Sequence, residues 1–309
     1  MEIENIEDFK GKYDSHIENI VFPEIIKFEK ERKIRLTLVN LTIIVCSLLF
    51  ISTPVISTSV GKDYLPYLIF CSLLPLISVK PWAKKNFEDK VKTMVMPIIM
   101  KSIPGFYWKQ TSPVTTTDIK NCMILPLVDI ASTTFDDCFI GEYRNINIAI
   151  SECKHCKREK NYFEGVIIKL DMNKKFSGNT VIRPRCASNI SSEIDLKLNK
   201  IKKINLEDTN FNEKFFIYST DEIEARYLLT PTFMERLYNT GKAFGSNFEY
   251  CAFYENSIYI ALNTDKDMFD LGDLNTPLDD KEQFDILFEE FASILALVDH
   301  FKLDQKLGL

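Results

Sequence analysis

Two long apolar stretches near the N-terminus dominate the hydropathy pattern of this chain. They run from Leu36 to Thr58 and from Tyr64 to Val79, and neither contains a charged residue. A bilayer core of about 30 Å needs roughly 20 apolar residues in a helix. The first stretch is long enough, and Pro75 is expected to kink the shorter second one. The pattern predicts a transmembrane helical hairpin over 34–82. A pair of buried core helices in a soluble protein is the alternative.

The basic residues around these stretches predict the orientation of the hairpin. The connecting loop, 59–63, offers only Lys62 against Asp63. Lysines and arginines that flank membrane helices collect on the cytoplasmic side. We therefore expect a multi-pass protein with both termini in the cytoplasm. The flanking residues are Lys27, Lys30, Arg32, Lys33 and Arg35 before the first stretch, and Lys80, Lys84, Lys85, Lys90 and Lys92 after the second.

The segment that precedes the hairpin, residues 1–33, has the pattern of an amphipathic cytoplasmic helical arm. Its apolar residues recur at steps of three and four, as on one face of a helix. Phe22-Pro23 is expected to break this helix and to start the next one. The apolar face could bind a partner or lie on the lipid surface, but we favour packing on the protein's own soluble domain. The residues of this face are Ile6, Phe9, Tyr13, Ile17, Ile20 and Val21.

The rest of the chain, 83–309, predicts one cytoplasmic α+β domain. Two runs, 145–152 and 163–170, are expected to pair as antiparallel neighbours across a charged turn at 154–160. A second hairpin is expected from 248–254 and 257–262, and shorter strands at 180–183 and 214–218. Helices are predicted at 232–240 and 284–303. Hairpin-linked strands with inserted and C-terminal helices indicate a mostly antiparallel sheet.

Composition narrows the classes of partner and cofactor. The formal net charge of -6 argues against nucleic-acid binding, which favours a basic excess. The basic residues beside the helices are better interpreted as contacts to anionic lipid headgroups, so the lipid bilayer is the expected partner. The eight cysteines show no disulfide framework, and those of the cytosolic domain are expected to stay reduced. No cofactor is predicted.

One cluster has metal-like spacing, Cys153-Lys154-His155-Cys156. A structural zinc needs four ligands, and this motif supplies two cysteines with a poorly placed histidine between them. A redox pair of the thioredoxin type needs its first cysteine at a helix N-terminus, whereas this one falls at a predicted strand end. We therefore predict no metal site, and we interpret the motif as part of a solvated hairpin tip.

A polar stretch around residue 221 gives the weak site candidates Asp221, Glu224 and Arg226. Ser219 with Glu222, or Asp221 with Glu224, has the spacing of a helix capping box. Glu222 and Arg226 are four residues apart, the favoured order for an ion pair on a helix. Thr230-Pro231 then has the pattern that opens a second helix. The functional interpretation is a ligand site, but we favour the structural one, in which these residues start and solubilise a helix.

Several short motifs resemble a known family. They are Phe139-Ile140-Gly141-Glu142, Ser151-Glu152, Phe163-Glu164-Gly165, Phe176-Ser177-Gly178 and the long stretch from Phe216 to Pro231. Together they resemble the bacterial membrane family catalogued as domain of unknown function 3137, over nearly the whole chain. The resemblance implies an anchored protein of the bacterial inner membrane without an assigned activity. It brings no catalytic or ligand residues, and the cysteine pair is not part of the pattern.

Two classes of function remain after this survey. The chain has no phosphate-binding glycine loop, no nucleophile elbow and no zinc-protease motif. We therefore lean towards a protein that is not an enzyme: a membrane-anchored interaction or scaffold module that binds a partner protein or the membrane surface. The alternative is a small-ligand sensor or enzyme with its site in the α+β domain. A deep polar pocket near Asp221 would favour that alternative.

Overall fold

The computed structural model describes residues 6–60, 65–125, 133–157, 160–172, 174–185, 201–264 and 274–306. These residues divide into two compact units. The first unit holds a β-sheet with its covering helices. The second unit holds two long helices, together with residues 274–282.

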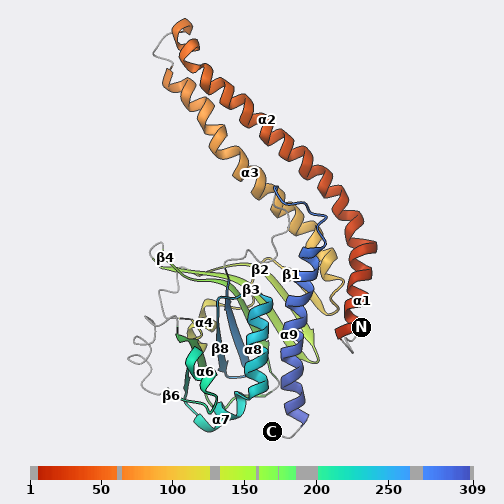
Figure 1. Ribbon diagram of the computed structural model, residues 1–309, viewed down its shortest axis with the longest axis vertical. Coiled ribbons are helices and arrows are strands. Elements are labelled where there is room, and N and C mark those ends of the chain that lie inside the picture. The colour runs from red at the N-terminus through yellow and green to blue at the C-terminus, as the bar shows by residue number, and fades with distance from the viewer. Residues whose placement is uncertain are drawn as a thin grey trace. The chain divides into compact units, whose positions relative to one another are not determined.

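The first unit is built on a nine-stranded sheet in the order β1-β2-β3-β4-β9-β8-β5-β7-β6 (Figure 1). Every neighbouring pair of strands is antiparallel. The α+β class and the antiparallel sheet are thus as the sequence predicts. The strands are β1 (Phe106–Lys109), β2 (Thr133–Tyr143), β3 (Ile146–Lys157), β4 (Lys160–Asp171), β5 (Thr180–Pro184), β6 (Lys202–Ile204), β7 (Phe215–Ser219), β8 (Phe248–Tyr254) and β9 (Ser257–Asn263).

Two helices, α8 (Pro231–Ala243) and α9 (Glu282–Lys306), cover one face of this sheet (Figure 1). The Phe233 ring of α8 lies 5.5 Å from that of Phe253 on β8. On α9, Phe291 stands edge-on to Phe106 and Phe139, at 5.4 and 5.6 Å between ring centroids. Buried aromatic contacts of this kind contribute beyond their buried area, so α9 binds firmly to the β1–β2 end of the sheet.

The opposite face of the sheet carries a second apolar layer under the short helix α4 (Thr116–Cys122). Tyr250, Ala252, Tyr259 and Ala261 belong to this layer. Because side chains alternate across a strand, their neighbours in β8 and β9 face α8 and α9 instead. Burial on both faces explains why these strands are almost continuously apolar.

The predicted strand pairs are confirmed, with differences at their ends. β3 and β4 pair from Asn147↔Asp171 to Lys157↔Lys160, so the turn between them is shorter than the predicted 154–160. β8 and β9 form the second predicted hairpin. The sequence did not predict β1, β2 and β6. Strand β2 was not predicted because Asp136-Asp137 interrupts its alternation of apolar and polar residues. The pairing register of β2 with β3 also shifts between Phe135 and Cys138.

Residues 6–60 form one nearly continuous helical run, of which residues 11–60 belong to the second unit. Helix α1 (Ile6–His16) leads into a π-helical turn, η1 (Ile17–Val21), and then α2 (Phe22–Val60). The predicted break at Phe22-Pro23 is wrong: the chain stays helical, and the N–H of Phe22 bonds to the carbonyl of Ile17. Pro23 is the second residue of α2, directly after the π-helical turn.

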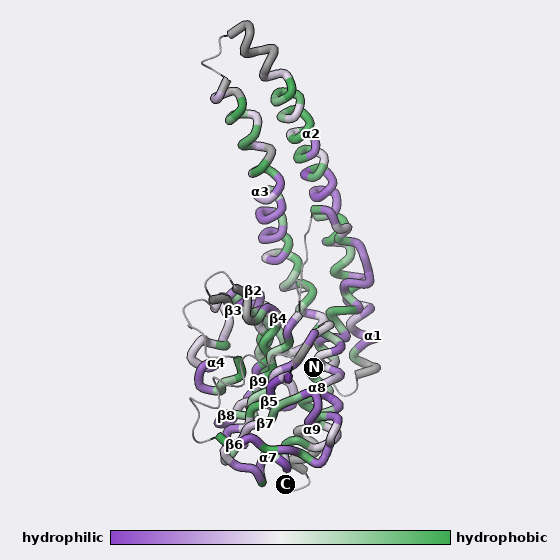
Figure 2. The backbone as a smooth tube through the Cα atoms, turned by 60° about the vertical axis from the view of Figure 1, so that its left-hand side comes forward, coloured by the Kyte–Doolittle hydropathy of each residue, from purple (hydrophilic) through white to green (hydrophobic). Residues whose placement is uncertain are grey.

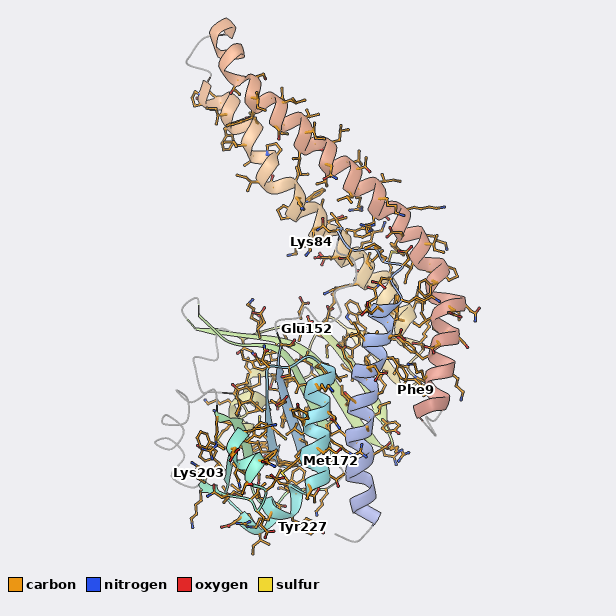
Figure 3. The ribbon with its side chains drawn as sticks, in the orientation of Figure 1. Phe9, Lys84, Glu152, Met172, Lys203 and Tyr227 are labelled. Carbon is orange, nitrogen blue, oxygen red and sulfur yellow. The ribbon has the colours of Figure 1, made fainter. Side chains whose placement is uncertain are left out.

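The apolar face of the arm is largely buried. Phe9, Tyr13, Ile17 and Val21 are at most 4% exposed, whereas Ile20 is 49% exposed. Phe9, labelled in Figure 3, belongs to the first unit, where its ring lies 5.1 Å from that of Phe288 on α9. The prediction that this face packs on the protein's own domain is therefore confirmed at Phe9.

The long helices α2 and α3 (Leu65–Met100) expose many apolar side chains. Figure 2 shows hydrophobic colour on the coloured later turns of α2 and on the first half of α3, followed on α3 by a polar stretch. Within the described residues, one helical stretch, Phe9–Thr53, contains a segment long and apolar enough to cross a membrane, and 11% of that segment is buried. The second predicted stretch falls on α3 from Leu65 onward, and among the described residues α3 contains no segment that meets the same test.

A buried ion pair fastens residues 274–282 to α2. The guanidinium of Arg32 donates to both carboxylate oxygens of Glu29, at 2.7 and 2.8 Å, and Nη1 donates to the carbonyl of Leu274 at 2.5 Å. The N–H of Leu278 in turn donates to Glu29 Oε2 at 3.1 Å. The hydrogen bond from Arg32, and then that from Leu278, hold the pKa of Glu29 down at about 2.

We predict that Glu29→Gln loosens this attachment. The depressed pKa of Glu29 gives stability that is full above its ordinary value of 4.5 and is lost as the pH falls towards 2. That shift corresponds to about 3 kcal/mol. In Glu29→Gln the amide hydrogen of Leu278 should exchange at least tenfold faster at pH 7, and further acidification should no longer speed opening of this segment.

The control is Glu24→Gln, because Glu24 forms an exposed pair with Lys27 at 2.6 Å. Exposed pairs contribute little, so exchange at Leu278 should match the wild type. Equal protection of Leu278 in both variants would contradict a stabilising role for the buried pair.

Candidate functional site

The candidate residues Asp221 and Glu224 meet a turn from a distant part of the chain. Asp221 is the N-cap of α7 (Glu222–Leu228), and its Oδ1 accepts from the N–H groups of Ile223 and Glu224, both at 3.0 Å. Its Oδ2 accepts from the hydroxyl of Ser177 at 3.0 Å. The predicted cap is therefore present, and the same carboxylate also joins α7 to the turn before β5.

Glu224 completes this junction between α7 and the turn. Its two carboxylate oxygens accept from the backbone N–H groups of Ser177 and Gly178, at 2.8 and 2.7 Å. A capping box would instead return this carboxylate to the backbone of Asp221, which here bonds to the hydroxyl of Ser219 at 3.1 Å. The four carboxylate oxygens of Asp221 and Glu224 thus all have protein donors.

The close approach at this junction requires a glycine at position 178. A Cβ atom there would lie 2.8 Å from Cβ of Asp221 and 2.9 Å from Oγ1 of Thr220. Contacts that short force the neighbouring backbone to move. The small size of Gly178 therefore allows two distant sequence motifs to approach each other. They are Phe176-Ser177-Gly178 and the stretch from Phe216 to Pro231.

Arg226 does not belong to the junction. It pairs with Glu222 at 2.8 Å on the exposed side of α7, as the spacing predicts. Thr230 caps α8 by accepting from the N–H of Phe233, with Pro231 in the first turn. The structure therefore brings together Asp221 and Glu224 and leaves Arg226 on the surface, where Tyr227 is also labelled in Figure 3.

The electrostatics of the junction indicate that the carboxylate of Asp221 is ionised and has a structural role. Hydrogen bonds from the backbone of Glu224, and then from the side chain of Ser177, lower the pKa of Asp221 from its ordinary value. A carboxylate that is ionised at neutral pH and already satisfied by protein donors has little to offer a ligand or a proton-transfer reaction.

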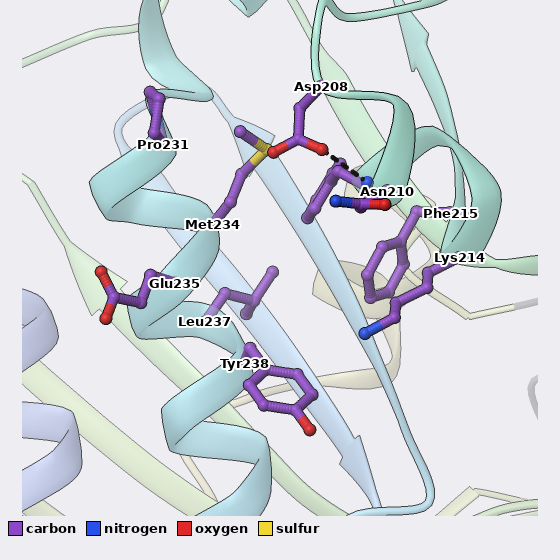
Figure 4. A pocket seen from close by; sticks show the side chains of 10 residues that line it. Asp208, Asn210, Lys214, Phe215, Pro231, Met234, Glu235, Leu237 and Tyr238 are labelled. Atoms are coloured by element: carbon purple, nitrogen blue, oxygen red, sulfur yellow. Dashed lines mark hydrogen bonds between the residues drawn. The ribbon is translucent and has the colours of Figure 1, made fainter.

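An open apolar groove lies between α6 (Thr209–Lys214) and α8, shown in Figure 4. Its volume is about 230 Å³. The Nζ of Lys214 lies 4.9 Å from the centre of the Tyr238 ring, at the mouth of the groove. Tyr238 is 52% exposed. The groove is lined by Asp208, Asn210, Phe211, Lys214, Phe215, Pro231, Met234, Glu235, Leu237 and Tyr238.

The cysteine motif lies on strand β3, and not in the turn that the sequence suggested. Cys153 is 3% exposed and belongs to the apolar layer beneath α4. The side chains of His155 and Cys156 lie outside the described residues. Among the described side chains, no group of three or more metal-ligating residues comes together.

Comparison with known families assigns one domain in the C-terminal part of the chain. A family model described as Protein of unknown function (DUF3137) matches residues 161–303. Residues 161–303 are a DUF3137 domain. The match is narrower than the sequence resemblance suggested, because Phe139-Ile140-Gly141-Glu142 and Ser151-Glu152 precede it. The DUF3137 domain contains both the junction at Asp221 and the groove between α6 and α8.

Other comparisons add little to the DUF3137 assignment. No curated protein matches the chain. The crystal structure of the mycobacterial trehalose monomycolate transport factor A, TtfA, is similar over 69% of this chain and 95% of that chain, at 12% sequence identity and a TM-score of 0.38. A likeness this remote decides nothing about fold or activity.

We predict that Glu224→Ala destabilises the DUF3137 domain, whereas Arg226→Ala does not. Removing Glu224 leaves two backbone N–H groups without their acceptor, at a cost of about 2 kcal/mol in the free energy of unfolding. Arg226→Ala should change it by less than about 0.5 kcal/mol, as is usual for exposed pairs. Denaturant unfolding of the full-length protein in detergent would measure both. Equal stability of Glu224→Ala and the wild type would show that these contacts do not hold the junction.

Proposed function

We propose that this protein is a membrane-anchored interaction module, which holds its α+β domain at the inner face of a bacterial membrane. The observation that carries the proposal is the apolar surface of α2 and α3. On α2, Leu38, Leu41, Ile44, Val45, Leu48, Leu49, Phe50 and Ile51 are 40–72% exposed; on α3, Tyr67, Phe70, Leu74 and Ile77 are 53–74% exposed. A continuous apolar patch of this kind marks a contact with lipid or protein.

The polar side chains along α2 are compatible with a bilayer. The hydroxyls of Thr42, Ser47 and Ser52 donate to carbonyls three or four residues earlier, at 2.7 to 2.8 Å. Such bonds satisfy hydroxyls inside the helix, which a bilayer requires. The first stretch contains no Asp, Glu, Lys, Arg or His that could carry a proton or an ion. We therefore assign anchoring, and not transport, to α2.

We further propose that α3 forms a second span antiparallel to α2. Near the base of the pair, Arg35 Nη1 donates to Asn86 Oδ1 at 2.8 Å, and Lys90 bonds to Glu31 at 2.6 Å. The earlier residue of α2, Glu31, contacts the later residue of α3, Lys90, and Arg35 contacts Asn86. This order of contacts means that the two helices run antiparallel. With the basic residues gathered at this base, the positive-inside rule favours cytoplasmic termini. Trp82, 69% exposed, would lie at the membrane interface.

For the α+β domain we propose binding of a partner protein through the groove between α6 and α8. The groove of about 230 Å³ is smaller than the roughly 300–1,000 Å³ of typical small-molecule sites. It could admit one or two apolar side chains of a partner. Lys214 and Glu235 on its rim offer both signs of charge for orienting that partner. Tethering raises the effective concentration of the domain towards proteins of the same membrane.

Photo-crosslinking tests this proposal, with two matched tyrosine positions. Tyr238 lies in the groove and is 52% exposed, whereas Tyr107 on the edge strand β1 is 54% exposed. A photoreactive phenylalanine analogue at position 238 in the intact, membrane-bound protein should give one adduct of defined mass, and the same analogue at 107 should not.

Reversal of the rim charge provides the specificity control. Glu235 is exposed, so Glu235→Lys should leave folding intact while reducing the adduct at 238 several-fold. Equal adducts from 238 and 107, or an adduct unaffected by Glu235→Lys, would contradict binding in the groove and favour a small-ligand sensor or enzyme.

A further inference from the structure

A buried arginine on the opposite face of the sheet has fewer partners than its chemistry requires. Arg183, on β5, is 4% exposed. Its Nη2 donates to the carbonyl oxygens of Met123 and Leu125, which follow α4. Its Nε and Nη1 have no hydrogen-bond partner among the described residues, although both atoms are buried. The contact with the end of α4 therefore accounts for only one of the three guanidinium nitrogens.

The missing partner is not a carboxylate of the described chain. Burial lowers the pKa of Arg183 to about 10, while Tyr250, Tyr218 and Cys122 act in the opposite direction. The guanidinium is therefore still a cation at neutral pH. A buried charge is normally paired, because leaving it unpaired costs several kcal/mol. A cation with two donors that no described residue accepts is chemically suited to an oxyanion.

Two further cations stand on the same face of the sheet, around Phe216. Phe216 is directly opposite Arg183 in the β5–β7 register, and Lys203 is opposite Tyr218. Residues that face each other, or stand two apart on a strand, share one face. The Cζ of Arg185 and the Nζ of Lys203 each lie 4.2 Å from the centre of the Phe216 ring. They are therefore no more than twice that distance apart.

These two cations have capacity for another ligand. Arg185 uses Nε to bond the carbonyl of Asn212 at 2.5 Å. Within the described chain, neither Arg185 nor Lys203 forms an ion pair with a carboxylate. Figure 3 labels Lys203 at the β6 edge of the sheet, where it is exposed. We name Arg183, Arg185, Lys203 and Phe216 the Arg183 face.

We propose that the Arg183 face binds a phosphate group. Arginine forks match the oxygens of a phosphate in pairs, and such charge-assisted bonds are among the strongest that proteins form. Arg185 and Lys203 stand at the accessible rim and would attract the anion, and Arg183 would supply Nε and Nη1 at its inner end. None of the four residues of the Arg183 face lines the groove between α6 and α8, so the proposal stands whether or not that groove binds a protein.

The test uses the full-length protein in nanodiscs of zwitterionic lipid, with inorganic phosphate as the probe. Thermal unfolding is followed as phosphate is added against sodium chloride of equal ionic strength. A ligand that binds the folded state raises the unfolding midpoint with its concentration. We expect a saturable rise, and an apparent dissociation constant at least tenfold weaker in Arg185→Gln and in Lys203→Gln.

Lys202→Gln is the matched control, because Lys202 is the exposed neighbour of Lys203 and points to the other face of the sheet. It removes the same charge and should keep the phosphate response. Arg183→Gln should abolish the response if it folds, and the two rim variants keep the test decisive if it does not. No rise above chloride, or an equal loss in Lys202→Gln and Lys203→Gln, would overturn the proposal.

Two further arms separate the sources of the phosphate group. Glycerol 3-phosphate represents a soluble ester, and nanodiscs that contain phosphatidic acid represent a lipid headgroup. Saturation by glycerol 3-phosphate, with no effect of phosphatidic acid, would identify a soluble ligand. Loss of the response to added phosphate in the acidic nanodiscs, restored by excess phosphate, would identify a headgroup. A carboxylate probe such as acetate that matches phosphate at equal concentration would contradict phosphate recognition.

Discussion

The apolar surface of α2 and α3 has to leave water, and the architecture of the chain follows from that constraint. Side chains such as Ile51 and Ile77 are more than 70% exposed, and burying a large apolar side chain is favourable by about 2 kcal/mol. Many such residues on one helical pair give a large favourable free energy for removing it from water, larger than exposed ion pairs contribute. In the proposed anchor, a bilayer would provide the burial, and the basic residues at the base of the pair would limit how far it could insert.

The α+β domain differs from α2 and α3, because its own helices and strands cover most of its apolar surface and supply hydrogen-bond partners to most of its buried polar groups. Helix α9 covers one face of the sheet through Phe291, and the layer beneath α4 covers the other. Asp221 and Glu224 direct all their oxygens to protein donors. Among the exceptions in the described chain are the open groove beside Tyr238 and two guanidinium nitrogens of Arg183. Such places can bind a ligand, whereas a polar group whose hydrogen bonds are all made within the protein cannot bind one without losing a bond.

Local chemistry in the sequence predicted much of the fold. The hairpin of β8 and β9, the Thr230-Pro231 start of α8 and the Glu222–Arg226 pair all depend on neighbours within a few residues, and all are confirmed. Features that depend on distant partners were missed. The bulge in β2 needs the register of β3, and the role of Glu224 needs the turn at Gly178, more than forty residues away. Arg183 gave no signal at all, because nothing in its local sequence shows that β5 buries it.

We propose that α2 and α3 form a membrane hairpin with the α+β domain on the cytoplasmic side. Labelling of intact cells with an impermeant maleimide tests it most directly, with single cysteines placed at Lys62 or Lys84 in a chain whose eight cysteines have been replaced. The account predicts labelling at position 62 in intact cells, and at position 84 only after permeabilisation. Labelling at 84 but not at 62, or equal labelling of both in intact cells, would contradict it.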